Sequence, residues 1–156
     1  MLDNSLGTGS ALAPNRVITN LYADPSDANR VWVSYSGYNI TTPDQPGHIF
    51  EVRRNGVSAM WIDLSYKLDD LPATAVVRDD VTGDLYAGTD FGVFQLQKGA
   101  TAWTMTNGMP MVEVAGLTIV PSARVLYAAT HGLGAWVFDL AKSHDKHDDH
   151  GGQGNN

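Results

Sequence analysis

The sequence repeats one order of parts three times, and this internal repeat limits the folds open to the chain more than any other feature. Each segment holds an apolar stretch, then an aromatic residue directly after an apolar one, and then a Gly-containing turn followed by more apolar residues. Tyr86 and Tyr127 occupy the same slot in the second and third segments, 41 residues apart. Leu71-Pro72 and Met109-Pro110 close the first and second segments, 38 residues apart. A repeat of this size is a small structural unit that buries its faces only against its neighbours.

Runs of β-branched and aromatic residues, bounded by Gly, Pro, Asn and Asp, predict strands throughout the chain. No stretch of 12 residues between Arg16 and Leu140 has helical spacing, which indicates an all-β fold. About four strands in roughly 40 residues are typical of a β-propeller blade, a small twisted four-stranded antiparallel sheet. A generic β-sandwich is the alternative. The predicted strands are 17–23, 30–36, 48–53, 60–63, 75–78, 84–89, 92–96, 102–105, 115–120, 125–130 and 134–138.

The repeat divides the chain into about three blades, a partial propeller. We expect blade 1 over 14–72 with an inserted loop at 37–46, blade 2 over 73–110, and an incomplete blade 3 over 111–140. The leader at 1–13 is interpreted as a remnant of a preceding blade, and the His/Asp-rich segment 141–156 is predicted to be a disordered tail. Closed propellers have about four to eight blades. We therefore expect missing propeller blades or a second copy of the chain to complete the ring.

Composition excludes several classes of protein. Ten Lys and Arg residues oppose seventeen Asp and Glu residues, and the net charge of -7 argues against a nucleic-acid partner. The absence of Cys excludes a disulfide framework and thiolate chemistry. The longest apolar runs, such as Val114 to Val120, are too short for a membrane span. The first residues, Met1 to Ser5, have no feature of a signal peptide.

The second and third segments resemble a known family. The stretch from Gly88 to Phe94, followed by Trp103 and Gly108-Met109-Pro110, is similar to the repeat of BNR or Asp-box propellers of the sialidase-like superfamily. The stretch from Tyr127 to Trp136 resembles the final blade of such proteins. The resemblance implies a propeller of extracellular or periplasmic origin. It does not imply one activity, because the same blades serve hydrolases, receptors and assembly factors.

The Asp box itself has decayed in this chain. In the family it reads Ser-x-Asp-x-Gly-x-Thr-Trp and forms a structural turn between the third and fourth strands of a blade. The corresponding stretch from Leu96 to Trp103 keeps the Trp and a displaced Gly but has Lys98 in place of the Asp. The first segment keeps only an Asn-Gly turn and Trp61.

In a propeller, the loops between strands two and three and those between blades share one face, where ligands usually bind. An Asp, a His and aromatic residues in these loops can hydrogen-bond to sugar hydroxyls and stack on a pyranose ring. The alternative is that each residue closes a hairpin, since Asp and His are tolerated in turns. The candidates for this ligand-binding face are Tyr38, Asn39, His48, Asp90, Phe91 and His131.

Glycoside hydrolysis needs two carboxyl groups at a defined separation. Asp90 could supply one, but the matching loop of the third segment has no acid, and Asp69-Asp70 is as readily a solvated turn. No catalytic residue can be assigned. We expect a non-catalytic binding or scaffold module that contacts glycan or protein. The alternative is the C-terminal fragment of a sialidase- or xyloglucanase-like glycoside hydrolase whose acids lie in missing blades.

The C-terminal tail is the one candidate metal site. His144, His147 and His150, interleaved with Asp, are residues that can ligate a divalent transition metal such as Zn, Ni or Cu. The alternative is a solubilising end or a linker, because a flexible tail loses entropy when it chelates. No other cofactor is expected.

Overall fold

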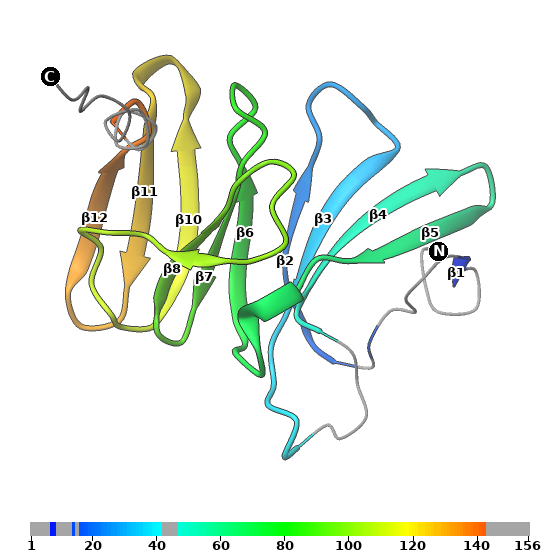
Figure 1. Cartoon of the computed structure of the whole chain (residues 1–156), viewed down its shortest axis with the longest axis horizontal. Helices are drawn as coiled ribbons and strands as arrows, with labels where there is room; N and C mark the ends of the chain where they lie inside the picture. The colour runs from blue at the N-terminus through cyan, green and yellow to red at the C-terminus, as the bar shows by residue number, and fades with distance from the viewer. Residues whose placement is uncertain (1–6, 9–13, 15, 42–46, 143–156) are drawn as a thin grey trace, which may run out of the picture.

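A computed structural model of the chain describes residues 7–8, 14, 16–41 and 47–142, and these residues form three antiparallel β-sheets (Figure 1). Sheet 1 contains β2 (Ile18–Ala23), β3 (Arg30–Tyr35), β4 (Ile49–Asn55) and β5 (Ser58–Asp63). Sheet 2 contains β6 (Ala73–Arg78), β7 (Leu85–Thr89), β8 (Gly92–Leu96) and β9 (Thr104–Met105). Sheet 3 contains β10 (Val114–Val120), β11 (Val125–Thr130) and β12 (Gly134–Asp139).

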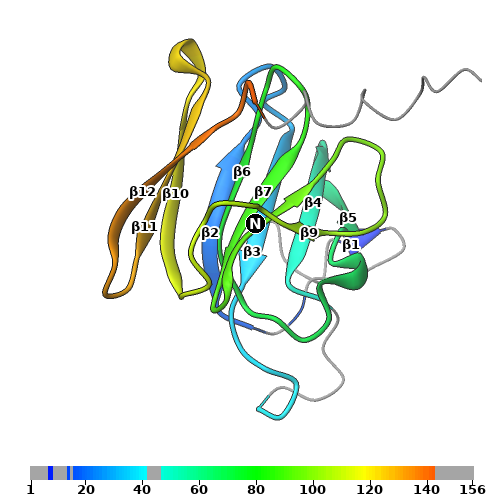
Figure 2. The same ribbon diagram turned by 60° about the vertical axis from the view of Figure 1, so that its left-hand side comes forward.

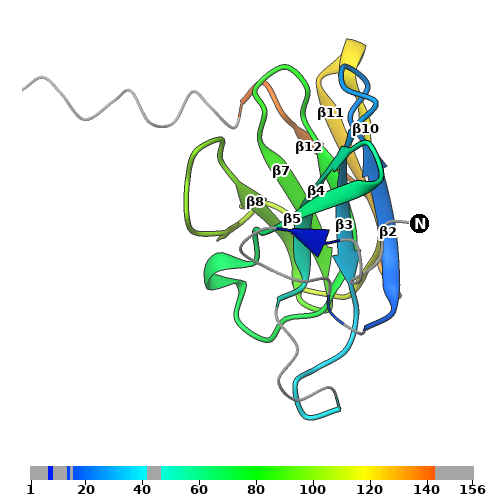
Figure 3. The ribbon, with the colours of Figure 1, turned by 90° about the vertical axis from the view of Figure 1, so that its right-hand side faces the viewer.

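Each sheet is a meander in which consecutive strands pair, and its first strand lies next to the first strand of the following sheet. Strand β2 contacts β6, and β6 contacts β10, so the sheets stack side by side. Strand β1 (Gly7–Thr8) is the exception to the antiparallel pattern, because it adds to the edge of sheet 1 by parallel pairing with β5 (Figure 3). The predicted all-β class, with blade-like antiparallel sheets, is confirmed.

Two hydrophobic layers hold the three sheets together. Trp32 of β3 is 3% exposed and packs with Val76 and Leu85 between sheets 1 and 2. Tyr86 of β7 is 0% exposed and packs with Leu126 between sheets 2 and 3. The repeated aromatic slot therefore supplies one large side chain to each layer, as its position after an apolar residue predicts.

The same slot in sheet 3 lies on a free face. Tyr127 is 46% exposed and Val137, its partner on β12, is 56% exposed. Sheet 3 is the last layer of the stack, and this outer face points away from sheet 2 (Figure 2). The described residues include nothing that packs against it as sheet 3 packs against Tyr86.

Some details differ from the strand predictions. The fourth strand of sheet 2 is only two residues long, because Trp103 leaves the ladder and its indole Nε1 donates a hydrogen bond to the carbonyl oxygen of Leu64 at 2.7 Å. Two short 3-10 turns, η2 (Tyr66–Leu68) and η3 (Pro121–Ala123), lie where the sequence predicted loops. Residues 42–46 of the inserted loop and the tail from 143 onward lie outside the described residues.

Within the described ranges, no helix has the length and apolar character needed to cross a bilayer.

Candidate functional site

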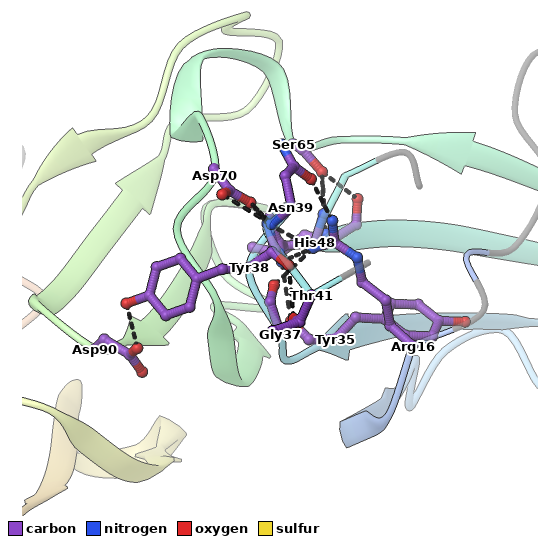
Figure 4. A network of polar contacts seen from close by, with 11 residues as sticks. Arg16, Tyr35, Gly37, Tyr38, Asn39, Thr41, His48, Ser65, Asp70 and Asp90 are labelled. Carbon is purple, nitrogen blue, oxygen red and sulfur yellow. Dashed lines mark hydrogen bonds and ion pairs between the residues drawn. The ribbon is translucent and has the colours of Figure 1, made fainter. Parts of the chain in front are cut away.

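The loops that join strands two and three of the sheets lie at one end of the molecule, here called the loop face (lower end of Figure 1). At this end, a hydrogen bond connects a loop of sheet 1 to a loop of sheet 2. The hydroxyl of Tyr38, in the β3–β4 loop, donates to Oδ2 of Asp90, in the β7–β8 loop, at 2.6 Å (Figure 4). This hydrogen bond, with some burial, raises the pKa of Tyr38 to about 12, because deprotonation would place a phenolate beside a carboxylate.

The β7–β8 hairpin presents Asp90 and Phe91 at its tip. The Thr89 hydroxyl donates to the Gly92 carbonyl at 2.9 Å and accepts from the Phe91 backbone N–H at 3.1 Å. Gly92 has φ of 113°, and a Cβ there would lie 2.9 Å from the Pro110 carbonyl oxygen, so only glycine fits the turn. This fixed hairpin leaves the Phe91 side chain 53% exposed.

A second cluster of hydrogen bonds holds the β3–β4 loop against the loop that precedes β6. The backbone N–H of Asn39 donates to both carboxylate oxygens of Asp70, at 2.8 and 2.9 Å. Arg16 donates to the Gly37 carbonyl at 2.8 Å and to Oδ1 of Asn39 at 2.5 Å (Figure 4). Because Asp70 ties the described part of the β3–β4 loop to the loop before β6, the two segments form one continuous rim.

His48 lies beneath this rim and is only 1% exposed. Burial, reinforced by the nearby Arg16 charge, lowers the pKa of His48, so its imidazole is neutral near pH 7. Nδ1 of His48 lies 3.3 Å from the Tyr35 carbonyl oxygen, Nε2 lies 3.4 Å from Oδ1 of Asp70, and Nη1 of Arg16 lies 2.9 Å from both ring nitrogens. The His48 backbone N–H donates to Oγ of Ser65 at 2.7 Å. These contacts make His48 a buried support of the rim.

An open hollow of about 500 Å³, here called the loop-face hollow, lies among the β3–β4 loop, residues 67–71 and the β7–β8 hairpin. Two of the sequence candidates line it, Tyr38 and Phe91, while Asp90 does not line it but accepts the hydrogen bond from Tyr38. Asn39 does not line the hollow, but its backbone N–H donates a hydrogen bond to Asp70, which does. The complete lining is Tyr38, Lys67, Leu68, Asp69, Asp70, Leu71, Phe91 and Phe94. Partly exposed rings beside carboxylates and an ammonium can both stack and hydrogen-bond, which are the elements of a small-ligand site.

The remaining candidates lie apart from the hollow. His131, at the tip of the β11–β12 hairpin, pairs with Glu113 at 3.0 Å between Nδ1 and Oε2, and it does not line the hollow. His144, His147 and His150 lie outside the described residues, and within the described part no three His, Asp or Glu residues gather as a metal site would require.

Sequence reasoning missed two contributors, Arg16 and Lys67, and left Asp70 open as a solvated turn. Arg16 lies 32 residues before His48 and 23 before Asn39, so no local motif marks these contacts. The sequence did offer a reason to place Asp70 at the site. Asp70 stands in a loop between blades, and such loops lie on the same face as the loops between strands two and three. The Asp69 backbone has φ of 56°, which turns the chain back after η2.

Replacing Asp90 with Asn is expected to lower the pKa of Tyr38 from about 12 toward the ordinary value for tyrosine, about 10. The neutral amide still accepts a hydrogen bond but no longer opposes a phenolate. NMR titration of the Tyr38 ring carbons measures the change. Tyr35, whose pKa burial raises to about 12, serves as the internal control. A Tyr38 titration unchanged by the substitution would contradict the Tyr38–Asp90 contact.

No protein-family model matches the sequence, and no curated protein matches it either. Solved structures do match. The β-propeller domain of Cps50 (Swd1) from Myceliophteria thermophila aligns with a TM-score of 0.58 at 14% identity, over 78% of this chain and 37% of that one. An auxiliary nutrient binding protein from Bacteroides thetaiotaomicron aligns with a TM-score of 0.54 at 14% identity, over 72% of this chain and 26% of that one.

A third structure, the extracellular domain of another B. thetaiotaomicron protein, aligns with a TM-score of 0.55 at 16% identity, over 79% of this chain and 15% of that one. At these identities the likeness concerns the fold, and the described sheets are those of a β-propeller. The chain spans between 15% and 37% of the length of these three structures.

Proposed function

We propose that the chain is a non-catalytic binding module built from β-propeller blades of the BNR type, and that it binds a glycan in the loop-face hollow. The observation that carries the proposal is the hydrogen bond from Tyr38 to Asp90, which joins two blades at the rim of a hollow with a half-exposed aromatic ring. Two of the similar structures are an auxiliary nutrient binding protein and an extracellular domain. Their descriptions support the proposal that this chain binds its ligand outside the cytoplasm.

The chemistry of the lining favours a carbohydrate. Phe91 is 53% exposed and Tyr38 is 38% exposed, so both rings offer an apolar face to a ligand. Asp69, Asp70 and Lys67 surround these rings with hydrogen-bonding groups. A sugar ring has an apolar face and a polar rim, and it therefore matches this combination.

Hydrogen bonds within the chain hold the described part of the rim, which favours binding. Contacts of Asn39 with Arg16 and Asp70 fix the first part of the β3–β4 loop, and the Thr89 hydroxyl fixes the β7–β8 hairpin. A preformed site avoids the loss of conformational entropy that loop ordering would otherwise cost on binding. The same order argues against a hydrolytic role for Asp70, because both of its oxygens accept hydrogen bonds from Asn39.

The free face of sheet 3 supports a second copy of the chain as partner. Tyr127 is exposed in the slot where Tyr86 is buried by a neighbouring sheet. At the other end of the stack, Phe50 and Trp61 of sheet 1 are 0% and 3% exposed, while Leu21 on β2 is 60% exposed. Two copies therefore meet through their sheet 3 faces, with the hollow of each left open.

Replacing Phe91 with Ala is expected to weaken glycan binding by roughly tenfold or more, since an exposed aromatic anchor typically contributes over about 1.4 kcal/mol. A panel of immobilised neutral oligosaccharides identifies the glycan, and calorimetry with it measures affinity. Leu133→Ala is the matched control, because Leu133 is also 53% exposed at a hairpin tip but lies outside the hollow. Equal affinity of the Phe91 and Leu133 variants, or turnover of chromogenic glycosides, would overturn the proposal.

A further inference from the structure

A second hollow, of about 250 Å³, lies between sheets 1 and 2 on the opposite side of η2 from the first. Tyr66 lines this hollow, whereas Lys67 and Leu68 line the loop-face hollow. Three basic side chains, Arg30, Arg78 and Lys98, contribute to its wall. We propose that this basic hollow binds a small oxyanion, the carboxylate or phosphate group of a soluble ligand.

The two arginines share one aromatic support. The guanidinium carbon of Arg30 lies 5.0 Å from the ring centroid of Trp32, and that of Arg78 lies 5.5 Å from it. Trp32 is 3% exposed, so its ring is fixed by the layer between the sheets. Cation–π contacts with a rigid ring position both guanidinium groups before any ligand arrives.

Each arginine pairs with a carboxylate through only some of its guanidinium N–H groups. Arg30 uses Nε and Nη2 on Asp24, and Arg78 uses Nη1 on Asp80 at 2.7 Å. Among the contacts of the described residues, Nη1 of Arg30 and Nη2 of Arg78 have no acceptor. These N–H groups suit carboxylate or phosphate oxygens, which guanidinium groups bind with directed hydrogen bonds.

The third cation, Lys98, is an exposed residue whose backbone is fixed by a buried acid. Its N–H donates to Oδ1 of Asp84 at 2.9 Å, and Asp84 is only 3% exposed. A Cβ added to Gly83 would lie 2.9 Å from Cδ of Lys98 and 3.4 Å from Nη2 of Arg78. The stem of Lys98 and the guanidinium of Arg78 therefore converge over Gly83, and the glycine leaves room for both.

The convergence of like charges is what points to an anion. Asp80 pairs only with Nη1 of Arg78, so an anion bound beside Nη2 and the Lys98 side chain would be attracted by both positive charges. Within the described residues, the ammonium of Lys98 forms no ion pair. Glu51, the acid in the lining, is paired with Arg53. The whole chain has a net charge of -7, so this basic hollow runs against the general field of the protein.

Calorimetric titration with inorganic phosphate and with malonate tests the proposal, and the tighter of the two identifies the group. We expect saturable binding that weakens as NaCl is raised. Lys98→Gln removes the charge but keeps a similar stem, and it should weaken binding roughly tenfold, as loss of a charge-assisted hydrogen bond does. Lys98→Arg should retain binding.

Lys67→Gln is the matched control, because it removes the same charge from the other hollow. Trp fluorescence provides a second readout, since Trp32 lies under both guanidinium groups. The proposal is wrong if neither anion binds, or if Lys67→Gln weakens binding as much as Lys98→Gln, which would indicate a response to net charge alone. Failure of glycan binding in the loop-face hollow would leave these outcomes unaffected.

Discussion

Replacing Asp79 with Ala is expected to lower the free energy of unfolding by about 3 kcal/mol or more, because it leaves a cation without its partner between two sheets. Asp79 is 1% exposed and follows the last residue of β6. Arg124, from the turn before β11, donates to both of its oxygens, at 2.5 Å from Nη1 and 2.6 Å from Nη2. This bidentate ion pair joins sheet 2 to sheet 3.

The Asp79 carboxylate also closes its own turn. It accepts from the Val81 backbone N–H and from the Thr82 hydroxyl, both at 3.0 Å. The Ala variant therefore loses the turn as well as the pair between sheets. Urea denaturation followed by circular dichroism measures the loss. Asp80→Ala is the control, since the exposed Asp80 pairs with Arg78 at the surface, and a loss within about 1 kcal/mol is expected there.

The same pair predicts the acid stability of the chain. Burial alone would raise the pKa of Asp79, but hydrogen bonds from Arg124, Val81 and Thr82 outweigh it and lower the pKa. A carboxyl group with a lowered pKa stabilises the fold fully above its unfolded pKa of about 3.9 and loses this contribution as pH falls through the folded value. Stability should therefore decline below about pH 5 in the parent, and less steeply in Asp79→Ala. An identical pH profile in both proteins would refute this role.

The sheets could be predicted from the sequence because the repeat encodes their packing locally. An aromatic residue next to an apolar one, as in Tyr86 and its neighbours, already indicates a strand buried on both faces. The hydrogen bonds between loops could not be predicted in this way. Tyr38 and Asp90 are 52 residues apart, and their contact depends on the path of two loops. Tyr38 and Phe91 were predicted for the loop face, but Arg16 gave no signal, because its role depends on the buried His48.

The break in the repeat at sheet 3 was visible in the sequence, but its consequence needed the structure. Counting strands predicted an incomplete third blade. Only the exposures distinguish the two ends of the stack, since Phe50 is buried at one end while Tyr127 is open at the other. The matched tyrosines Tyr86 and Tyr127 therefore offer a direct measure of what covers a blade.

Replacing Tyr86 with Ala is expected to lower the free energy of unfolding by about 3 to 5 kcal/mol, the usual cost of an aromatic cavity in a core. Tyr86 is 0% exposed and packs against Phe138, with ring centroids 6.3 Å apart. Tyr127→Ala removes the same side chain from the equivalent slot. In an isolated chain its effect should stay within about 0.5 kcal/mol, as at other exposed positions.

If two copies meet through sheet 3, Tyr127 is buried in the dimer and its loss becomes visible. We then expect light scattering to show a dimer of the parent chain, and Tyr127→Arg to yield a folded monomer, because a charge would be buried without a partner in the contact. Leu21→Arg is the control, since Leu21 is 60% exposed at the far end of the stack, on β2. A monomeric parent chain, or equal disruption by Leu21→Arg, would exclude the sheet 3 contact.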